Sequence, residues 1–192
     1  CLEEEGIGII FGLPGEENAD FMMALEKSEK IRFVLTRHEQ GAAFMAEAYG
    51  RLTGNPAGCL STLGPGATNL ITGVADANMD RAPMIVLTGQ GSTDRLHKES
   101  HQIMDTVSMF KPVTKWATSI FNPDTIPEIV RKAVRISRSE KPGAVLIELP
   151  EDVARQTASS KPIAPRRYRR SVPDMTVIEE ASKLLIQSKR PL

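Results

Sequence analysis

The chain has 192 residues, of which 41% are hydrophobic and 25% charged, a composition typical of globular rather than disordered proteins. Its 24 basic and 24 acidic side chains balance to a net charge of zero, which argues against a dedicated nucleic-acid-binding protein, because such proteins carry a basic surface. No apolar run approaches the roughly 20 residues of a membrane-spanning helix, so no membrane partner is expected. Two cysteines are too few for a disulfide framework or a structural zinc site, and we expect a cytoplasmic protein.

Short β-rich runs alternate with longer helical patterns along the first 150 residues. In chain order, the patterns predict strands at 8–11, 31–35, 58–62, 84–88, 112–116 and 144–149, and helices at 17–27, 37–52, 67–79 and 126–136. Strands that alternate with helices form parallel βαβ units. The sequence therefore predicts an α/β fold with a doubly wound, mostly parallel sheet of about six strands and helices on both faces.

The composition changes after Pro150. Residues 156–173 are rich in Ser, Pro and Arg, as in a linker, and the basic run 166–170 is more typical of a solvated segment than of a nucleic-acid patch. Apolar spacing from 172 to 185 predicts one more helix. We therefore expect a domain over residues 1–155, a linker over 156–173, and the start of a truncated second domain over 174–192.

Four of the predicted strands are followed by glycine-rich or polar loops, at 12–15, 36–41, 63–69 and 89–102. Ligands bind at the carboxyl ends of the strands in an open parallel sheet, so these loops are candidate binding elements. The run Gly64-Pro65-Gly66 lacks the ending of a phosphate-binding P-loop and the third glycine of the dinucleotide pattern. Taken alone, it indicates only a tight turn between a strand and a helix.

Glu39 has two interpretations. Thr36 and Glu39 have the spacing of a capping box, in which the carboxylate would bond back to the Thr36 amide. Alternatively, Glu39 places a carboxylate beside a cofactor, where the small residues 41–43 leave room for a ring. The three histidines show no metal-ligand spacing, so no metal site built by this chain is predicted.

Three runs taken together resemble the N-terminal pyrimidine-binding domain of thiamine-diphosphate enzymes. They are residues 11–15, 37–51 and 64–70, and the likeness extends over about residues 1–155. Within that group, residues 101–105 followed by 110–115 look most like acetolactate synthase. Each run alone is a weak signal, whereas the combination in this order is specific.

The resemblance implies roles for individual residues. Glu39 would be catalytic, hydrogen-bonding a ring nitrogen of the cofactor's aminopyrimidine and favouring the imino tautomer that takes up a proton. Gln102 would be the second catalytic residue, near the reactive carbon and the substrate. The implied cofactor-binding residues are Pro14, Glu39, Thr62, Pro65 and Asn69.

The resemblance also implies partners. The cofactor would be thiamine diphosphate with Mg²⁺, the metal being held by a C-terminal domain absent from this chain, and FAD is left open. The first interpretation is an acetolactate synthase, which condenses two pyruvates with loss of CO₂. The alternatives are a related decarboxylase, oxidase or glyoxylate carboligase, acting on another 2-oxo acid, or a non-catalytic binding module.

A cofactor site shared between subunits implies a homodimer or tetramer, and a fragment that is inactive alone. The predicted helices at 37–52 and 67–79 supply apolar surface for such contacts, unless neighbouring helices of the same chain cover it.

Overall fold

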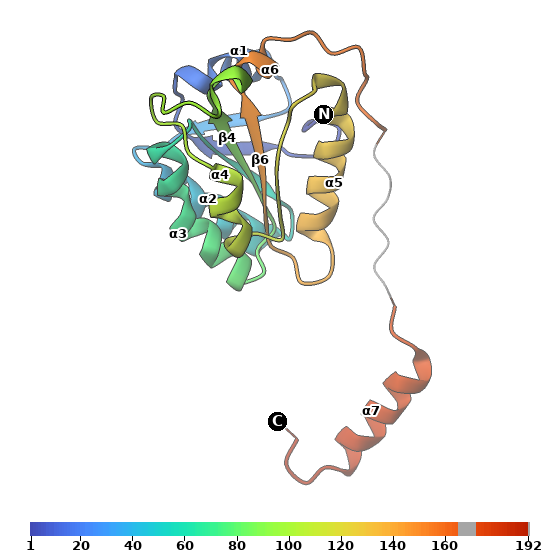
Figure 1. The fold of residues 1–192 in the computed structure, drawn as a ribbon. Helices are drawn as coiled ribbons and strands as arrows, with labels where there is room; N and C mark the ends of the chain where they lie inside the picture. Colours follow the sequence, from blue (N-terminus) through green and yellow to red (C-terminus); the bar gives the residue numbers. More distant parts are fainter. Residues whose placement is uncertain (165–171, 192) are drawn as a thin grey trace.

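The computed structural model describes residues 1–164 and 172–191 and contains one parallel sheet flanked by helices (Figure 1). The strands are β1 (Ile9–Gly12), β2 (Arg32–Leu35), β3 (Ala57–Ser61), β4 (Met84–Gln90), β5 (Trp116–Ser119) and β6 (Ala144–Pro150). They lie in the order β2-β1-β3-β4-β6-β5, and every pairing is parallel. The predicted α/β fold is confirmed.

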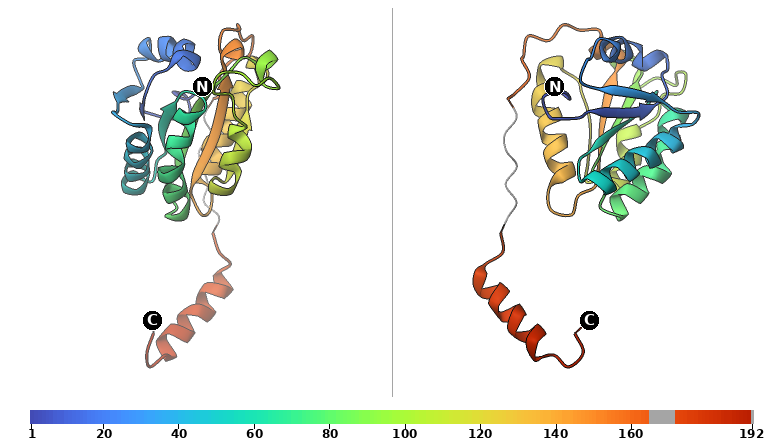
Figure 2. Two further views of the ribbon diagram at one scale, coloured as in Figure 1. Left: turned by 60° about the vertical axis from the view of Figure 1, so that its left-hand side comes forward. Right: turned by 180° about the vertical axis from the view of Figure 1, so that it is seen from behind.

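Helices cover both faces of the sheet, as the two views of Figure 2 show. The α-helices are α1 (Ala19–Glu26), α2 (Glu39–Thr53), α3 (Pro65–Met79), α4 (Thr106–Phe110), α5 (Ile126–Arg138), α6 (Glu151–Ala154) and α7 (Met175–Gln187). Short 3-10 turns are η1 (Glu16–Asn18), η2 (Thr93–Arg95), η3 (Lys111–Val113) and η4 (Pro123–Thr125). Helices α2, α3 and α4 pack in the core on one face, whereas α1 and α5 pack on the other.

Strands β3 and β4 are buried along their whole length, because helices lie over both of their faces. The face under α2 and α3 is packed with small side chains, and a Cβ added at Gly73 would lie 2.7 Å from the Cβ of Ala43. This contact lets the two helices approach closely. Side chains of α7 are all exposed, so the helix adds nothing to this core.

The predicted strand at 112–116 is wrong. Residues Lys111–Val113 form η3, and β5 begins only at Trp116. Pro112 has no N–H to donate to a neighbouring strand, and the pairing with β6 starts with the Lys115 amide, which donates to the Ala144 carbonyl at 2.8 Å.

The first part of the predicted linker is attached to the domain. Asp124 accepts hydrogen bonds from the backbone amides of Ser159 and Ser160 at 2.6 and 2.9 Å. Arg131 of α5 donates to the carbonyls of Ile163 and Ala164 at 3.0 and 2.7 Å. The basic run 166–170 lies outside the described residues.

Candidate functional site

The order of the strands places a topological switch point between β1 and β3. These strands are neighbours, with Gly12 paired to Leu60, yet the chain leaves β1 toward α1 on one face and leaves β3 toward α3 on the other. In open α/β sheets, ligands bind outside the carboxyl ends of the strands at such a point. Three of the loops that the sequence singled out begin at the carboxyl ends of β1, β3 and the adjacent β2.

Glu39 begins α2 and is half-buried, but it does not form the capping box considered above. The cap is His38, whose Nδ1 accepts from the Gln40 amide at 3.1 Å, and the Thr36 hydroxyl donates to the His38 carbonyl. The Glu39 carboxylate instead faces α3, where its Oε2 accepts from Asn69 Nδ2 at 3.0 Å. Within the described chain Oε1 has no hydrogen-bond partner, so it can engage a ligand.

Gly66 brings the start of α3 against two of the predicted residues. A Cβ at this position would lie 2.9 Å from Thr62 Cγ2 and 3.4 Å from Glu39 Oε1. The hydroxyl of Thr62 donates to Glu17 Oε2 at 2.6 Å, and a Cβ at Gly15 would lie 2.6 Å from the Cβ of Thr62. Thr62 therefore joins the loop after β1 to the loop after β3.

Gln102 reaches the same place from the loop after β4. Gly64 has a φ of 55° and a ψ of −122°, and a Cβ there would lie only 2.4 Å from the Gln102 carbonyl oxygen. Gln102 itself has a φ of 55°, which non-glycine residues rarely adopt. Its side chain is exposed, so it is free to contact a bound molecule.

The structure thus brings most of the sequence-predicted residues around residues 64–66. The four direct members are Glu39, Thr62, Asn69 and Gln102. Pro65 is exposed between the two glycines of this turn, and Pro14 is exposed next to Gly15. The arrangement offers a carboxylate, an amide donor and a hydroxyl around a wall without side chains.

Sequence reasoning missed three polar residues near this rim. Glu17 bonds to Thr62, while Gln90 and Glu148 are buried beneath the loop that carries Gln102. For Glu148 a signal existed, since it is the one charged residue within the otherwise apolar run 144–149. Glu17 and Gln90 carry no comparable signal.

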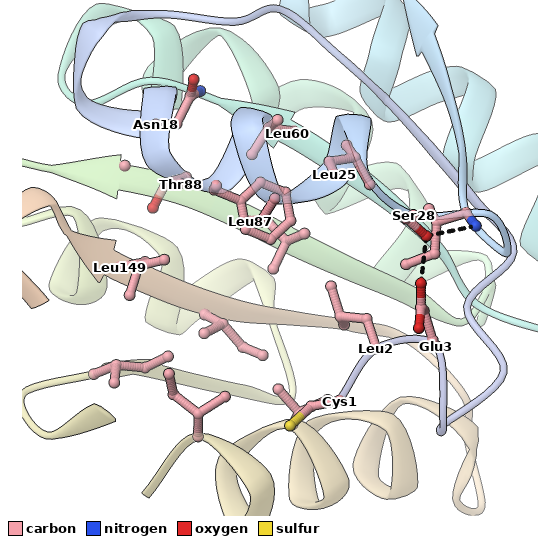
Figure 3. A pocket seen from close by; sticks show the side chains of 18 of the residues that line it. Cys1, Leu2, Glu3, Asn18, Leu25, Ser28, Leu60, Leu87, Thr88 and Leu149 are labelled. Carbon is pink, nitrogen blue, oxygen red and sulfur yellow. Dashed lines mark hydrogen bonds between the residues drawn. The ribbon is translucent and has the colours of Figure 1, made fainter. Parts of the chain in front are cut away.

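An apolar cavity lies elsewhere in the domain. It measures about 270 Å³ and opens on the face of the sheet that α1 and α5 cover, mostly among aliphatic side chains such as Leu25, Leu60 and Leu87 (Figure 3). None of the predicted site residues lines it, and Glu17 is its one link to them. We base the candidate site on the polar groups at the switch point, because the cavity offers few groups that could orient a polar ligand.

Three carboxylates also converge between α2 and α3. Oxygen atoms of Glu47, Asp76 and Asp80 lie within 4.8 Å of one another. The guanidinium of Arg51 binds Glu47 at 3.2 Å and Asp80 at 2.5 Å, and so supplies the positive charge that a cation would bring. We interpret this group as an ion-pair contact between the two helices.

Comparison with known proteins shows to which sequences the chain is similar. Residues 1–109 match the family model described as "Thiamine pyrophosphate enzyme, N-terminal TPP binding domain". A probable acetolactate synthase large subunit of Methanocaldococcus jannaschii is 40% identical over 100% of this chain and 34% of its own length. The acetolactate synthase large subunit of Corynebacterium glutamicum is 39% identical over 100% of this chain and 31% of its own.

A glyoxylate carboligase of Escherichia coli is also 39% identical, over 100% of this chain and 33% of its own length. The chain therefore spans about a third of the length of these curated relatives. In the part of the chain that the structure describes, no helix has the length and apolar character needed to cross a bilayer.

Proposed function

Since the chain belongs to the thiamine pyrophosphate enzymes as an N-terminal TPP-binding domain, we propose that Glu39 is the residue through which it activates the cofactor. The observation that carries the proposal is the placement of Glu39 Oε1. This atom has no hydrogen-bond partner within the described chain, and it lies at the switch point beside the bare wall of Gly66. A flat heteroaromatic ring requires this combination of one carboxyl group and open space.

The residues present fit an aminopyrimidine. Asn69 holds Oε2 of Glu39, which fixes the direction of the carboxyl group and leaves Oε1 for a ring nitrogen. A side chain at position 66 would collide with Thr62 and crowd Glu39 Oε1, and glycine avoids both contacts. We propose that Pro14 and Pro65 close the edges of the pocket, where each is exposed beside a glycine.

When bound, thiamine diphosphate would supply carbanion chemistry and an electron sink for 2-oxo acids. The part of this chain is to hold and move a proton at Glu39 Oε1, for which a carboxyl within hydrogen-bond reach is needed. Gln102 lies across the Gly64 turn, and its exposed amide can donate to a carboxylate or a developing oxyanion on the substrate.

We propose that the whole polypeptide is an acetolactate synthase that condenses two pyruvates, because synthases of that name match the chain along its full length. Glyoxylate carboligation is the second candidate, since a carboligase of that name is 39% identical. Supplying the full-length protein with pyruvate or glyoxylate, and identifying the product, distinguishes the two. If the protein formed a product from neither acid, both proposed activities would be contradicted.

Glu39→Gln in the full-length protein tests the role of the carboxyl group. The amide keeps the size of the side chain but cannot relay a proton, so turnover should fall by at least about 100-fold, the lower end of what general acid–base groups contribute. Glu26→Gln, an exposed glutamate at the end of α1, is the matched control and should leave turnover unchanged. Turnover of Glu39→Gln within twofold of the wild type would refute the proposal.

The domain division and the metal extend the proposal. We assign residues 1–155 to the pyrimidine-binding domain, 156–173 to a linker, and 174–192 to the start of a central domain, whose apolar surface would cover the exposed side chains of α7. The Mg²⁺ that accompanies thiamine diphosphate would be bound by the part of the polypeptide that follows.

Assembly through α2 and α3 is part of the same proposal. Ala42, Ala43 and Ala46 of α2 are buried within the chain. Three larger apolar side chains are not, since Phe44 and Met45 of α2 and Met79 of α3 are 38, 48 and 80% exposed. These apolar side chains suit a symmetric partner. Sedimentation of the full-length protein at micromolar concentration should give a dimer or tetramer, and a monomer would contradict this part of the proposal.

A further inference from the structure

A buried polar pair lies beneath the loop that carries Gln102, and the proposed mechanism does not use it. Gln90 ends β4 and is 1% exposed, while Glu148 lies on the adjacent β6 and is 4% exposed. Burying an amide and a carboxyl group in an aliphatic core is unfavourable unless both are hydrogen-bonded. Their presence in strands that are otherwise apolar therefore calls for a physical reason.

The side-chain amide of Gln90 is fully engaged. Its Nε2 donates to Glu148 Oε2 and to the Met104 carbonyl, both at 2.9 Å, and its Oε1 accepts from the Gly91 amide at 2.9 Å. The opposite orientation of the amide would set its oxygen against two acceptors, so only one orientation satisfies all three partners. Gln90 thus connects the core of the sheet to one point on the overlying loop.

Glu148 fixes that orientation from below. Its strand pairs with β4 at Thr88 and with β5 at Ser119, which places the carboxyl group between both neighbours. Burial raises the pKa of Glu148, while the hydroxyls of Ser119 and Thr106 and the amide of Gln90 oppose that rise. The Asp105 carboxylate adds to the rise, and no basic side chain among the described residues counters it. The carboxyl group therefore acts as a hydrogen-bond acceptor for Gln90 rather than as half of an ion pair.

The Met104 carbonyl, which accepts from Gln90, lies two residues after Gln102 in the chain. Between them the chain has no regular secondary structure, and Gln102 occupies the left-handed region with its carbonyl against Gly64. Such a conformation persists only where the surroundings hold it. Before Gln102, Arg95 bonds to Ser100, whose carbonyl accepts from the Ile103 amide. After Gln102, the Met104 carbonyl accepts from the Thr106 backbone amide and from Gln90 Nε2, both at 2.9 Å, and the bond from Gln90 is the one that ties it to the sheet.

We propose that Gln90 and Glu148 are positioning residues that hold the Gln102 backbone against Gly64 and thereby set where the Gln102 amide meets the substrate. This inference rests on the proposed role of Gln102. Neither Gln90 nor Glu148 contacts the substrate, because both are buried under the loop. Their effect passes through the Met104 carbonyl.

The test uses four variants of the full-length protein: Gln90→Leu, Glu148→Leu, Glu148→Gln and Gln102→Ala. Leucine removes the hydrogen bonds at similar volume, whereas Glu148→Gln keeps an oxygen that can accept from Gln90 and controls for misfolding. Gln90→Leu and Glu148→Leu should raise the KM for the 2-oxo acid about tenfold, the effect of one lost hydrogen bond. Glu148→Gln should stay within twofold, and half-saturation by thiamine diphosphate should hardly change in any variant.

Two further measurements separate positioning from a general loss of structure. In the Gln102→Ala background, Gln90→Leu should raise KM no further, because the two residues act in series. Amide hydrogen exchange of residues 101–104 in the cofactor-free protein should be at least about tenfold faster in Gln90→Leu, with exchange in β3 unchanged.

Unchanged exchange at 101–104, or additive effects on KM, would overturn the inference. If Gln102→Ala itself left KM unaltered, the proposed role of Gln102 would fail, and hydrogen exchange would still decide whether Gln90 holds the loop.

Discussion

Replacing Gly64 by Ala should lower the free energy of unfolding by roughly 2–6 kcal/mol. A φ of 55° with a ψ of −122° lies in a region that only glycine occupies readily, and forcing another residue there costs about 1–3 kcal/mol. The added Cβ would also lie 2.4 Å from the Gln102 carbonyl oxygen. That neighbour is a backbone atom, so the loop must shift, and overpacking of this kind costs about 1–3 kcal/mol.

Two other glycines provide matched controls. Gly54 has a φ of 69° at the end of α2, and a Cβ there meets no atom within 4 Å, so Gly54→Ala should cost only the backbone term of about 1–2 kcal/mol. Gly41 lies inside α2 with equally open space, and Gly41→Ala should stabilise the chain by about 0.5–1 kcal/mol.

Urea denaturation followed by circular dichroism measures all three variants. If Gly64→Ala costs no more than Gly54→Ala, the Gln102 carbonyl does not lie against residue 64, and the arrangement of loops described above is incorrect.

Because burial raises the pKa of Glu148, the folded state binds its proton more tightly than the unfolded state does. Wild-type stability should therefore fall relative to Glu148→Gln as the pH rises above the ordinary value of 4.5. Urea unfolding between pH 4 and 8 measures both proteins, and a wild-type stability that rises with pH relative to that of Glu148→Gln would contradict this prediction. Burial also raises the pKa of the Cys59 thiol, so iodoacetamide at pH 8 should modify the partly exposed Cys1 and reach Cys59 only in denaturant. Phe110→Ala, at a fully buried position, should lower the free energy of unfolding by about 3–5 kcal/mol, whereas Leu52→Ala, at 86% exposure, should change it by no more than about 0.5 kcal/mol. Equal midpoints of the two variants in urea would contradict the placement of Phe110 in the core.

Periodicity predicted most of the sheet because five of the six strands and the longer helices have a clear pattern. Runs such as 84–88 are apolar throughout, as a strand covered on both faces must be, and the helices alternate with them. The predicted strand at 112–116 failed because local propensity says nothing of where the partner strand begins. Pairing with β6 starts at Lys115, and Pro112 cannot take part.

The candidate site was predicted less completely. Resemblance to a family identified Glu39 and Gln102, and the fold brought both to the turn around Gly64. The spacing of Thr36 and Glu39 suggested a cap, but His38 satisfies the helix start and leaves the carboxylate to Asn69. Contacts such as this one join residues 30 positions apart, and no local pattern encodes them.

The order of the strands has a consequence for synthesis on the ribosome. Strands β1 to β4 can pair with one another as they emerge, because each neighbour has already been made. Strand β5 is different, since its partner in the sheet is β6, and Pro150 lies 31 residues after Ser119. At about 5–20 residues per second, β5 waits roughly 2–6 seconds without a partner. During that interval the open edge of β4 is the place where a nascent chain could pair wrongly, and β6 closes it.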